Sequence, residues 1–103
     1  NTSGDSSKHG VALGAARDLL RRVRALDSLR LEGLMTIGPL HGGPSGARAS
    51  FRALAGIREE ARQDGILGDR AELSMGMSDD FEIAIEEGST MIRVGTALFG
   101  ARP

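Results

Sequence analysis

Hydrophobic positions along this chain follow two patterns, a helical period and short continuous runs. The helical period predicts three helices, at residues 12–26, at residues 45–63, and from Ser78 or Asp79 to Gly88. Apolar runs that stop in small or polar residues predict buried strands at residues 29–37, 71–75 and 90–94. Helices and strands therefore alternate, which predicts an α/β fold with right-handed crossovers and one parallel sheet.

Each predicted helix has one face that we expect to be buried. Arginines occupy the other faces of the first helix, and we interpret them as a solvated surface and not as an anion site. Strand 29–37 carries apolar residues on both faces, so we expect the sheet to be covered on both sides. The expected core positions are Ala12, Ala16, Leu19, Val23 and Leu26, then Phe51, Leu54, Ala55 and Ile57, then Phe81, Ala84 and Ile85.

Composition narrows the class of protein. A length of 103 residues suffices for one small domain or for half of a larger one, and the chain begins with Asn, which suggests a longer parent. The 13 basic and 14 acidic residues are interspersed, so we expect neither a nucleic-acid nor a membrane partner. The chain has no cysteine, which removes thiolate chemistry and fits a cytoplasmic location. His41 stands alone in a glycine-rich loop, so we predict no metal site.

The ends of the last two strands carry residues suited to an anion. We expect adjacent parallel strands to bring Ser74 and the pair Gly95 and Thr96 to the same edge of the sheet, where α/β folds bind ligands. Gly95 lets backbone amides approach an anion, and residues 96–99 are expected to begin a short helical turn. The acidic start of the third helix would repel an anion, so we place it beside Gly95 and Thr96.

Arg93 has two interpretations. If its strand face points into a barrel, the guanidinium lies in a partly dehydrated interior and needs an acceptor. That acceptor is either a ligand or Glu72 on the neighbouring strand. The spacing of the residues does not decide between these two acceptors. If the acceptor is Glu72, Gly95 is an ordinary strand terminator.

Residues 73–102 read LSMGMSDDFEIAIEEGSTMIRVGTALFGAR. This segment closely resembles the C-terminal signature of the pyridoxal phosphate homeostasis proteins. The segments LEGLMTI and NTSGDSSKHGV and the helix that contains Phe51 are also similar to that family. The resemblance covers nearly the whole chain.

The resemblance implies a fold and a cofactor. The family fold is a barrel akin to the N-terminal domain of alanine racemase, and residues 1–103 match the C-terminal half of such a (β/α)8 TIM-type barrel, without the N-terminal half. The implied cofactor is pyridoxal 5'-phosphate (PLP), whose Schiff-base lysine lies in the absent half. Lys8, the only lysine, is expected in a polar loop with nothing apolar around it, so we expect no Schiff base there.

The resemblance also implies residue roles. Ser74, Gly95 and Thr96 would hold the phosphate, and Arg93 would approach the pyridine nitrogen. Because an arginine keeps its proton, that nitrogen would accept a hydrogen bond and stay unprotonated, which weakens the ring as an electron sink. This suits a carrier better than a catalyst.

Three functions remain open from the sequence. The favoured one is a non-enzymatic protein that buffers or delivers PLP and has no catalytic residues. The alternative is a fragment of an alanine-racemase-type enzyme, which would need an acid–base tyrosine from a further domain, and this chain contains no tyrosine. The third is a truncated product without activity. We expect the partner to be the missing half-barrel or a second copy through self-association.

Overall fold

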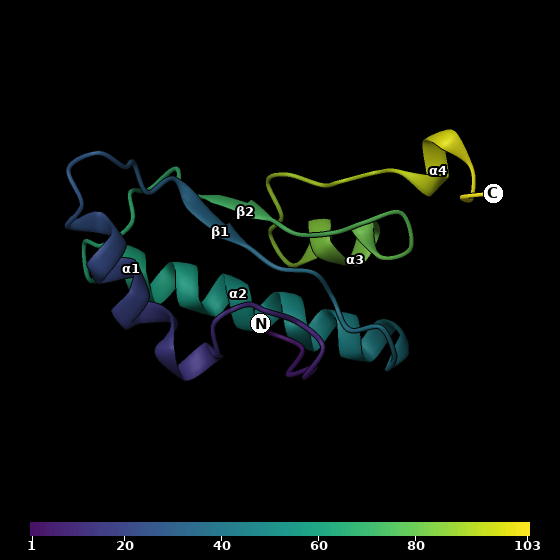
Figure 1. Cartoon of the computed structure of the whole chain (residues 1–103), viewed down its shortest axis with the longest axis horizontal. Coiled ribbons are helices and arrows are strands. Elements are labelled where there is room, and N and C mark those ends of the chain that lie inside the picture. Colours follow the sequence, from purple (N-terminus) through teal and green to yellow (C-terminus); the bar gives the residue numbers. More distant parts are fainter.

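The computed structural model describes residues 1–103 and confirms the alternation of helices and strands (Figure 1). The elements in order are a 3-10 turn η1 at Leu13–Ala15, α1 at Ala16–Arg24, β1 at Gly33–Met35, α2 at Gly43–Gln63, β2 at Glu72–Ser74, α3 at Phe81–Glu86 and α4 at Thr96–Phe99. None of these helices combines the length and the apolar character that a membrane crossing requires.

The strands form a small parallel sheet. β1 and β2 pair with Leu34 opposite Leu73, and Ser74 bridges in parallel to Met91 in the next extended segment. The N–H of Arg93 donates to the carbonyl of Gly76 at 2.9 Å and continues that third line of pairing. β2 is therefore central, and the predicted last strand is present as an extended segment with a single bridge.

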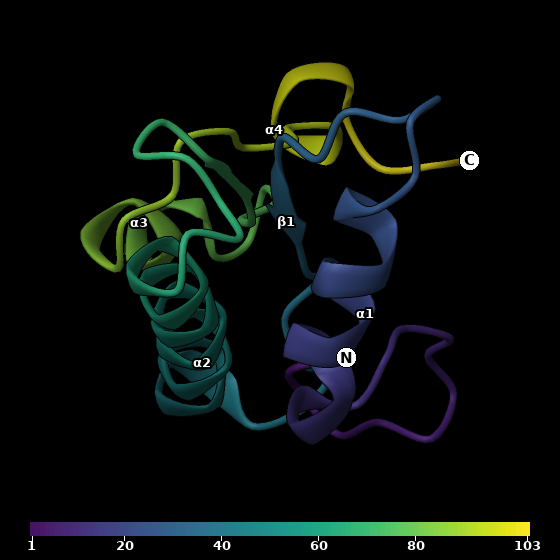
Figure 2. The ribbon, with the colours of Figure 1, turned by 90° about the vertical axis from the view of Figure 1, so that its left-hand side faces the viewer.

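The core lies between this sheet and α2. Alternate residues of the β2 segment, Leu73 and Met75, are fully buried against Phe51 of α2, with Ala84 of α3 beside them. Burying one such large side chain contributes about 1.5–3 kcal/mol. A second cluster joins α1 to the far end of α2 through Leu20 and Ala61. Figure 2 shows these two helices side by side, in line with that contact.

Two of the predicted buried faces are confirmed only in part. In α1 Ala16 is buried as predicted, but Leu20 is buried in place of Leu19, which is 42% exposed. In α3 Ala84 is fully buried as predicted, but Ile83 packs on the core in place of Ile85, which is 54% exposed. The helix α3 also begins later than predicted, at Phe81 and after a turn.

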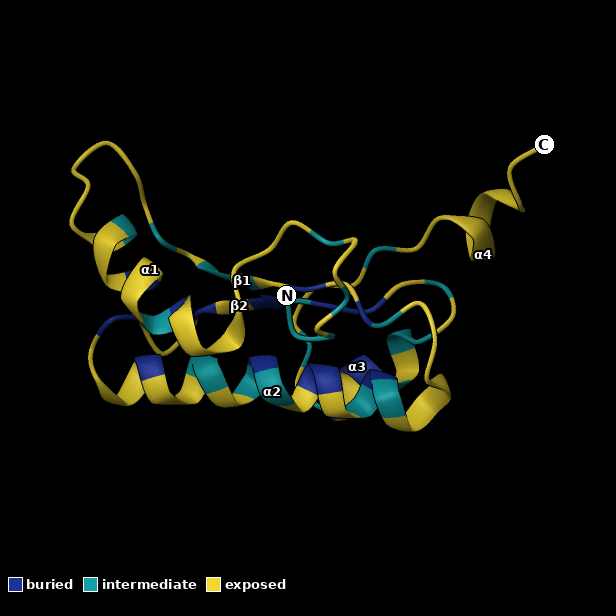
Figure 3. Ribbon diagram, turned by 60° about the horizontal axis from the view of Figure 1, so that its bottom comes forward, coloured by how far each residue is buried: buried dark blue, intermediate teal, exposed yellow.

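The expectation of a sheet covered on both sides is also wrong. α1, α2 and α3 lie on one side of the strands (Figure 3), where Leu34 and Thr36 face α2. The opposite face is open, with Met35 57% and Met91 50% exposed. The strand predicted at residues 29–37 is also shorter than expected, because β1 covers only three of those nine residues.

Candidate functional site

The site is built at the end of β2, where the chain turns into α3. Gly76 has φ +104°, and a Cβ there would lie 2.8 Å from the Cβ of Ala84 and 3.1 Å from the Cα of Phe81. Only glycine combines this backbone conformation with such a close approach. The turn that follows is closed by Asp80, whose Oδ1 accepts a hydrogen bond from the N–H of Met77 at 2.8 Å.

This turn places Ser78 against the end of the third strand segment. Its Oγ accepts hydrogen bonds from the N–H of Gly95 at 3.3 Å and from the N–H of Ala97 at 3.0 Å. Thr96 begins α4, as predicted, so the Ser78 hydroxyl lies among the first backbone amides of that helical turn. Sequence reasoning treated Ser78 only as a helix cap. The signal that it missed was the position of Ser78 beyond the buried strand.

The structure does not bring Ser74 to this place. Ser74 pairs with Met91, four residues before Gly95, which corresponds to about 13 Å along an extended chain at about 3.3 Å per residue. The expectation that Ser74, Gly95 and Thr96 reach one edge is therefore wrong for Ser74, because the register places it inside the ladder. Its role in cofactor binding stays a prediction.

Arg93 reaches across β2 to the end of β1. Its Nη2 donates to the carbonyl oxygen of Thr36 at 2.7 Å, while its Nε is buried and has no hydrogen-bond partner. The alternative of an Arg93–Glu72 pair is wrong, because the carboxylate of Glu72 instead accepts a hydrogen bond from the hydroxyl of Thr90. A buried donor without an acceptor costs about 1–3 kcal/mol, so this Nε is suited to an acceptor supplied by a ligand.

Lys8 is held more tightly than its polar segment suggests. Its Nζ donates to the carbonyl oxygens of Ile37 at 3.1 Å and Gly38 at 2.6 Å and to the Oγ of Ser3, and it pairs with Asp5 at 3.3 Å. The side chain is 18% exposed, and these partners are polar, as expected for its segment. The hydrogen bond from Lys8 also lowers the pKa of the Asp5 carboxyl. The ammonium is thus part of the structure at the end of β1.

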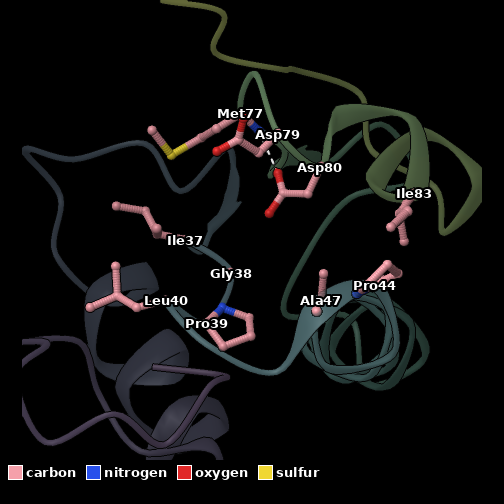
Figure 4. A pocket seen from close by; sticks show the side chains of 11 residues that line it. Ile37, Gly38, Pro39, Leu40, Pro44, Ala47, Met77, Asp79, Asp80 and Ile83 are labelled. Atoms are coloured by element: carbon pink, nitrogen blue, oxygen red, sulfur yellow. Dashed lines mark hydrogen bonds between the residues drawn. The ribbon is translucent and has the colours of Figure 1, made fainter. Parts of the chain in front are cut away.

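A cleft of about 430 Å3 lies next to the turn, between it and the loop that follows β1 (Figure 4). Ile37 and Leu40 form one wall and Ala47 and Ile83 the other, with the carboxylates of Asp79 and Asp80 at its edge. Like charges repel, so these carboxylates make the cleft unfavourable for a phosphate. The amides of Gly95 and Ala97 therefore remain the better anion-binding groups.

Comparison with known proteins adds to this geometry. The model of the alanine racemase N-terminal domain family matches residues 1–103. The pyridoxal phosphate homeostasis protein of Caenorhabditis elegans is 45% identical over 105 residues, which cover 99% of this chain and 43% of that protein. The protein of the same name from Pseudomonas aeruginosa is 47% identical over 102 residues, which cover 99% of this chain and 42% of that protein.

Solved structures of related proteins also superpose on this chain. A protein from Bifidobacterium adolescentis, described as unknown, superposes with a TM-score of 0.88 at 44% identity, over 96% of this chain and 40% of that one. PipY of Synechococcus elongatus with PLP bound superposes with a TM-score of 0.79 at 37% identity, over 91% of this chain and 44% of that one. The chain thus spans less than half the length of these relatives. The resemblance drawn from the sequence is confirmed: the chain belongs to the alanine racemase N-terminal domain family, and over nearly its whole length it is similar to the pyridoxal phosphate homeostasis proteins.

Proposed function

We propose that this chain contributes to PLP binding in a protein of PLP homeostasis, which buffers or delivers the cofactor. The observation that carries the proposal is the Nε of Arg93, which is buried and has no hydrogen-bond partner. Shortly after Arg93 the chain turns at Gly95, where backbone amides converge on Ser78. The names of the curated relatives and the PLP-bound structure of PipY support it.

The residues present fit the two polar ends of PLP. Gly95 and Thr96 would hold the phosphate, Gly95 through its backbone amide and Thr96 through its hydroxyl. The Oγ of Ser78 already accepts hydrogen bonds from the amides of Gly95 and Ala97. Arg93 would donate through Nε to the pyridine nitrogen and, being permanently protonated, would keep that nitrogen unprotonated. When bound, PLP supplies an aldehyde that reacts with primary amines.

We propose further that residues 1–103 are the C-terminal half of a (β/α)8 barrel. Three parallel strand segments have helices on one side only, and the exposed side carries the apolar Met35, Ile37 and Met91. A closed barrel would bury that side and remove both free edges. The partner is then the other half-barrel or, without it, a second copy of the chain.

The homeostasis role has more support than an enzymatic one. The relatives carry the name of homeostasis proteins. We therefore propose a protein without catalytic residues of its own. A cytoplasmic location stays a prediction.

The experiment that tests the site compares PLP with pyridoxal, which lacks the phosphate. Ser78→Ala and Thr96→Val each remove a hydroxyl at the phosphate position, and a hydrogen bond to a charged group is worth about 1.5–3 kcal/mol, roughly tenfold to a hundredfold in affinity. We expect that loss for PLP and little change for pyridoxal, measured by fluorescence titration. Ser74→Ala is the matched serine variant within the sheet.

The outcomes separate the two serines. If only Ser74→Ala weakens PLP, the phosphate contact belongs to Ser74, as the sequence predicts. Equal losses for PLP and pyridoxal in all variants would mean that the hydroxyls support the fold and do not touch the anion.

A further inference from the structure

Three consecutive carbonyl oxygens at the end of β1 accept hydrogen bonds from two cations. Arg93 Nη2 donates to the carbonyl of Thr36, and Lys8 Nζ donates to those of Ile37 and Gly38. Arg93 is thereby hydrogen-bonded to the end of β1, although β2 lies between β1 and the segment that carries Arg93. The position of the Thr36 peptide therefore sets where the guanidinium lies.

We propose that Thr36 is a positioning residue for Arg93. Its side-chain hydroxyl holds the end of β1 so that its own carbonyl restrains Nη2 and leaves Nε free for a ligand. This inference rests on the proposed function, because it assigns the orientation of the group that would meet the pyridine ring.

The hydroxyl of Thr36 belongs to a partly buried chain of three hydroxyl groups. Thr36 is 4% exposed, and its Oγ1 lies 2.7 Å from the Oγ1 of Thr2, which also contacts the Oγ of Ser50, itself 3% exposed. Thr2 lies in the N-terminal segment, Thr36 at the end of β1 and Ser50 in α2. The chain of hydroxyls therefore joins three parts of the molecule at the peptide that Arg93 contacts.

The backbone of Thr36 is also held on its other side. Its N–H donates to the carbonyl of Ser74 at 3.1 Å, which connects it to β2. With the N–H and the side chain both anchored, little freedom remains for the carbonyl. Loss of the hydroxyl would release one of these anchors and widen the range of Arg93 orientations without altering Arg93 itself.

This role predicts a ligand dependence unlike that of the phosphate residues. Arg93 faces the ring, which PLP and pyridoxal share, so a mispositioned Arg93 weakens both by the same factor. Variants at Ser78 or Thr96 affect only the ligand that carries a phosphate. The two sets of residues are thus distinguishable by the same pair of ligands.

The test uses Thr36→Val, which removes the hydroxyl and keeps the branched shape, and Thr36→Ser, which retains the hydroxyl. Thr90→Val is the matched control, because the hydroxyl of Thr90 accepts the N–H of Leu73 at 2.8 Å in the same sheet and does not contact Arg93. The readouts are the solvent exchange of the Arg93 Nε proton by 15N NMR and the affinities for PLP and pyridoxal.

We expect Thr36→Val to accelerate Nε exchange and to weaken both ligands equally, by about threefold to tenfold, as for one neutral hydrogen bond. Thr36→Ser should resemble the unmodified chain, and Thr90→Val should lower stability without changing Nε exchange. Thr2→Ala removes the partner of Thr36 from a segment outside the helices and strands, and it tests the same contact if Thr36→Val fails to fold.

Unchanged Nε exchange in both Thr36→Val and Thr2→Ala would overturn the proposal, as would an equal change in Thr90→Val. If the unmodified chain binds neither ligand, the proposed function fails, whereas the exchange comparison still decides whether Thr36 positions Arg93.

Discussion

Replacement of Gly76 by alanine tests how the turn at the end of β2 brings α3 close to the sheet. Gly76 has φ +104°, a conformation that costs an L-residue about 1–2 kcal/mol. The added Cβ would also lie 2.8 Å from the Cβ of Ala84 and 3.1 Å from the Cα of Phe81, and such overpacking costs a further ~1–3 kcal/mol. We therefore expect Gly76→Ala to lower the free energy of unfolding by about 2–5 kcal/mol.

Gly88→Ala is the matched control for this prediction. Gly88 has φ +102°, but a Cβ there would meet nothing within 4 Å, so only the conformational cost of about 1–2 kcal/mol applies. Urea denaturation followed by circular dichroism gives both values. Equal losses in the two variants would refute the steric part of the reasoning, because they would leave the contact with Ala84 and Phe81 without a measurable cost.

Three further predictions concern charge, association and covalent chemistry. Hydrogen bonds from Arg52 and Arg48 lower the pKa of Glu87. The contribution of Glu87 to stability should therefore be complete above the ordinary glutamate pKa and lost as the pH falls through the lowered value. The free energy of unfolding, measured as a function of acid pH, should show this loss for the unmodified chain and for Glu82→Gln, but not for Glu87→Gln. The open sheet face should cause the chain to self-associate. The double variant Met35→Ser and Met91→Ser should reduce this association in sedimentation experiments. A strictly monomeric unmodified chain with a sharp calorimetric transition would contradict the prediction. Borohydride reduction with PLP should give only scattered, substoichiometric label by peptide mass mapping, because the Lys8 Nζ is already bound to the carbonyls of Ile37 and Gly38 and to Asp5. Stoichiometric label on Lys8 would contradict this.

Much of the fold follows from the sequence because long periodic segments carry a clear signal. α2 was expected at residues 45–63 and spans Gly43–Gln63, with Phe51 and Leu54 buried as predicted. In α1 and α3 one apolar residue each is buried in place of the predicted one, because the spacing of apolar residues allows neighbouring stripes and tertiary packing chooses between Leu19 and Leu20.

The site was predictable in its residue types but not in its register. Gly95, Thr96 and the turn of α4 lie where the strand pattern placed them. The choice between Ser74 and Ser78 depends on how the segment after β2 aligns with residues 90–95, and a strand pattern alone does not determine that alignment. The hydrogen bond from Arg93 to a backbone carbonyl has no signature in the sequence at all.

The most direct measurement of the central claim is a 15N NMR titration of the chain with PLP. The proposed site predicts that the backbone amides of Gly95 and Ala97 and the Nε of Arg93 shift together as PLP is added. The phosphate would accept these N–H groups in place of Ser78 Oγ, whose hydroxyl would then donate to the phosphate, and the ring nitrogen would meet Nε. Shifts confined to the cleft residues Ile37, Leu40 and Met77, with Gly95, Ala97 and Arg93 unaffected, would contradict it.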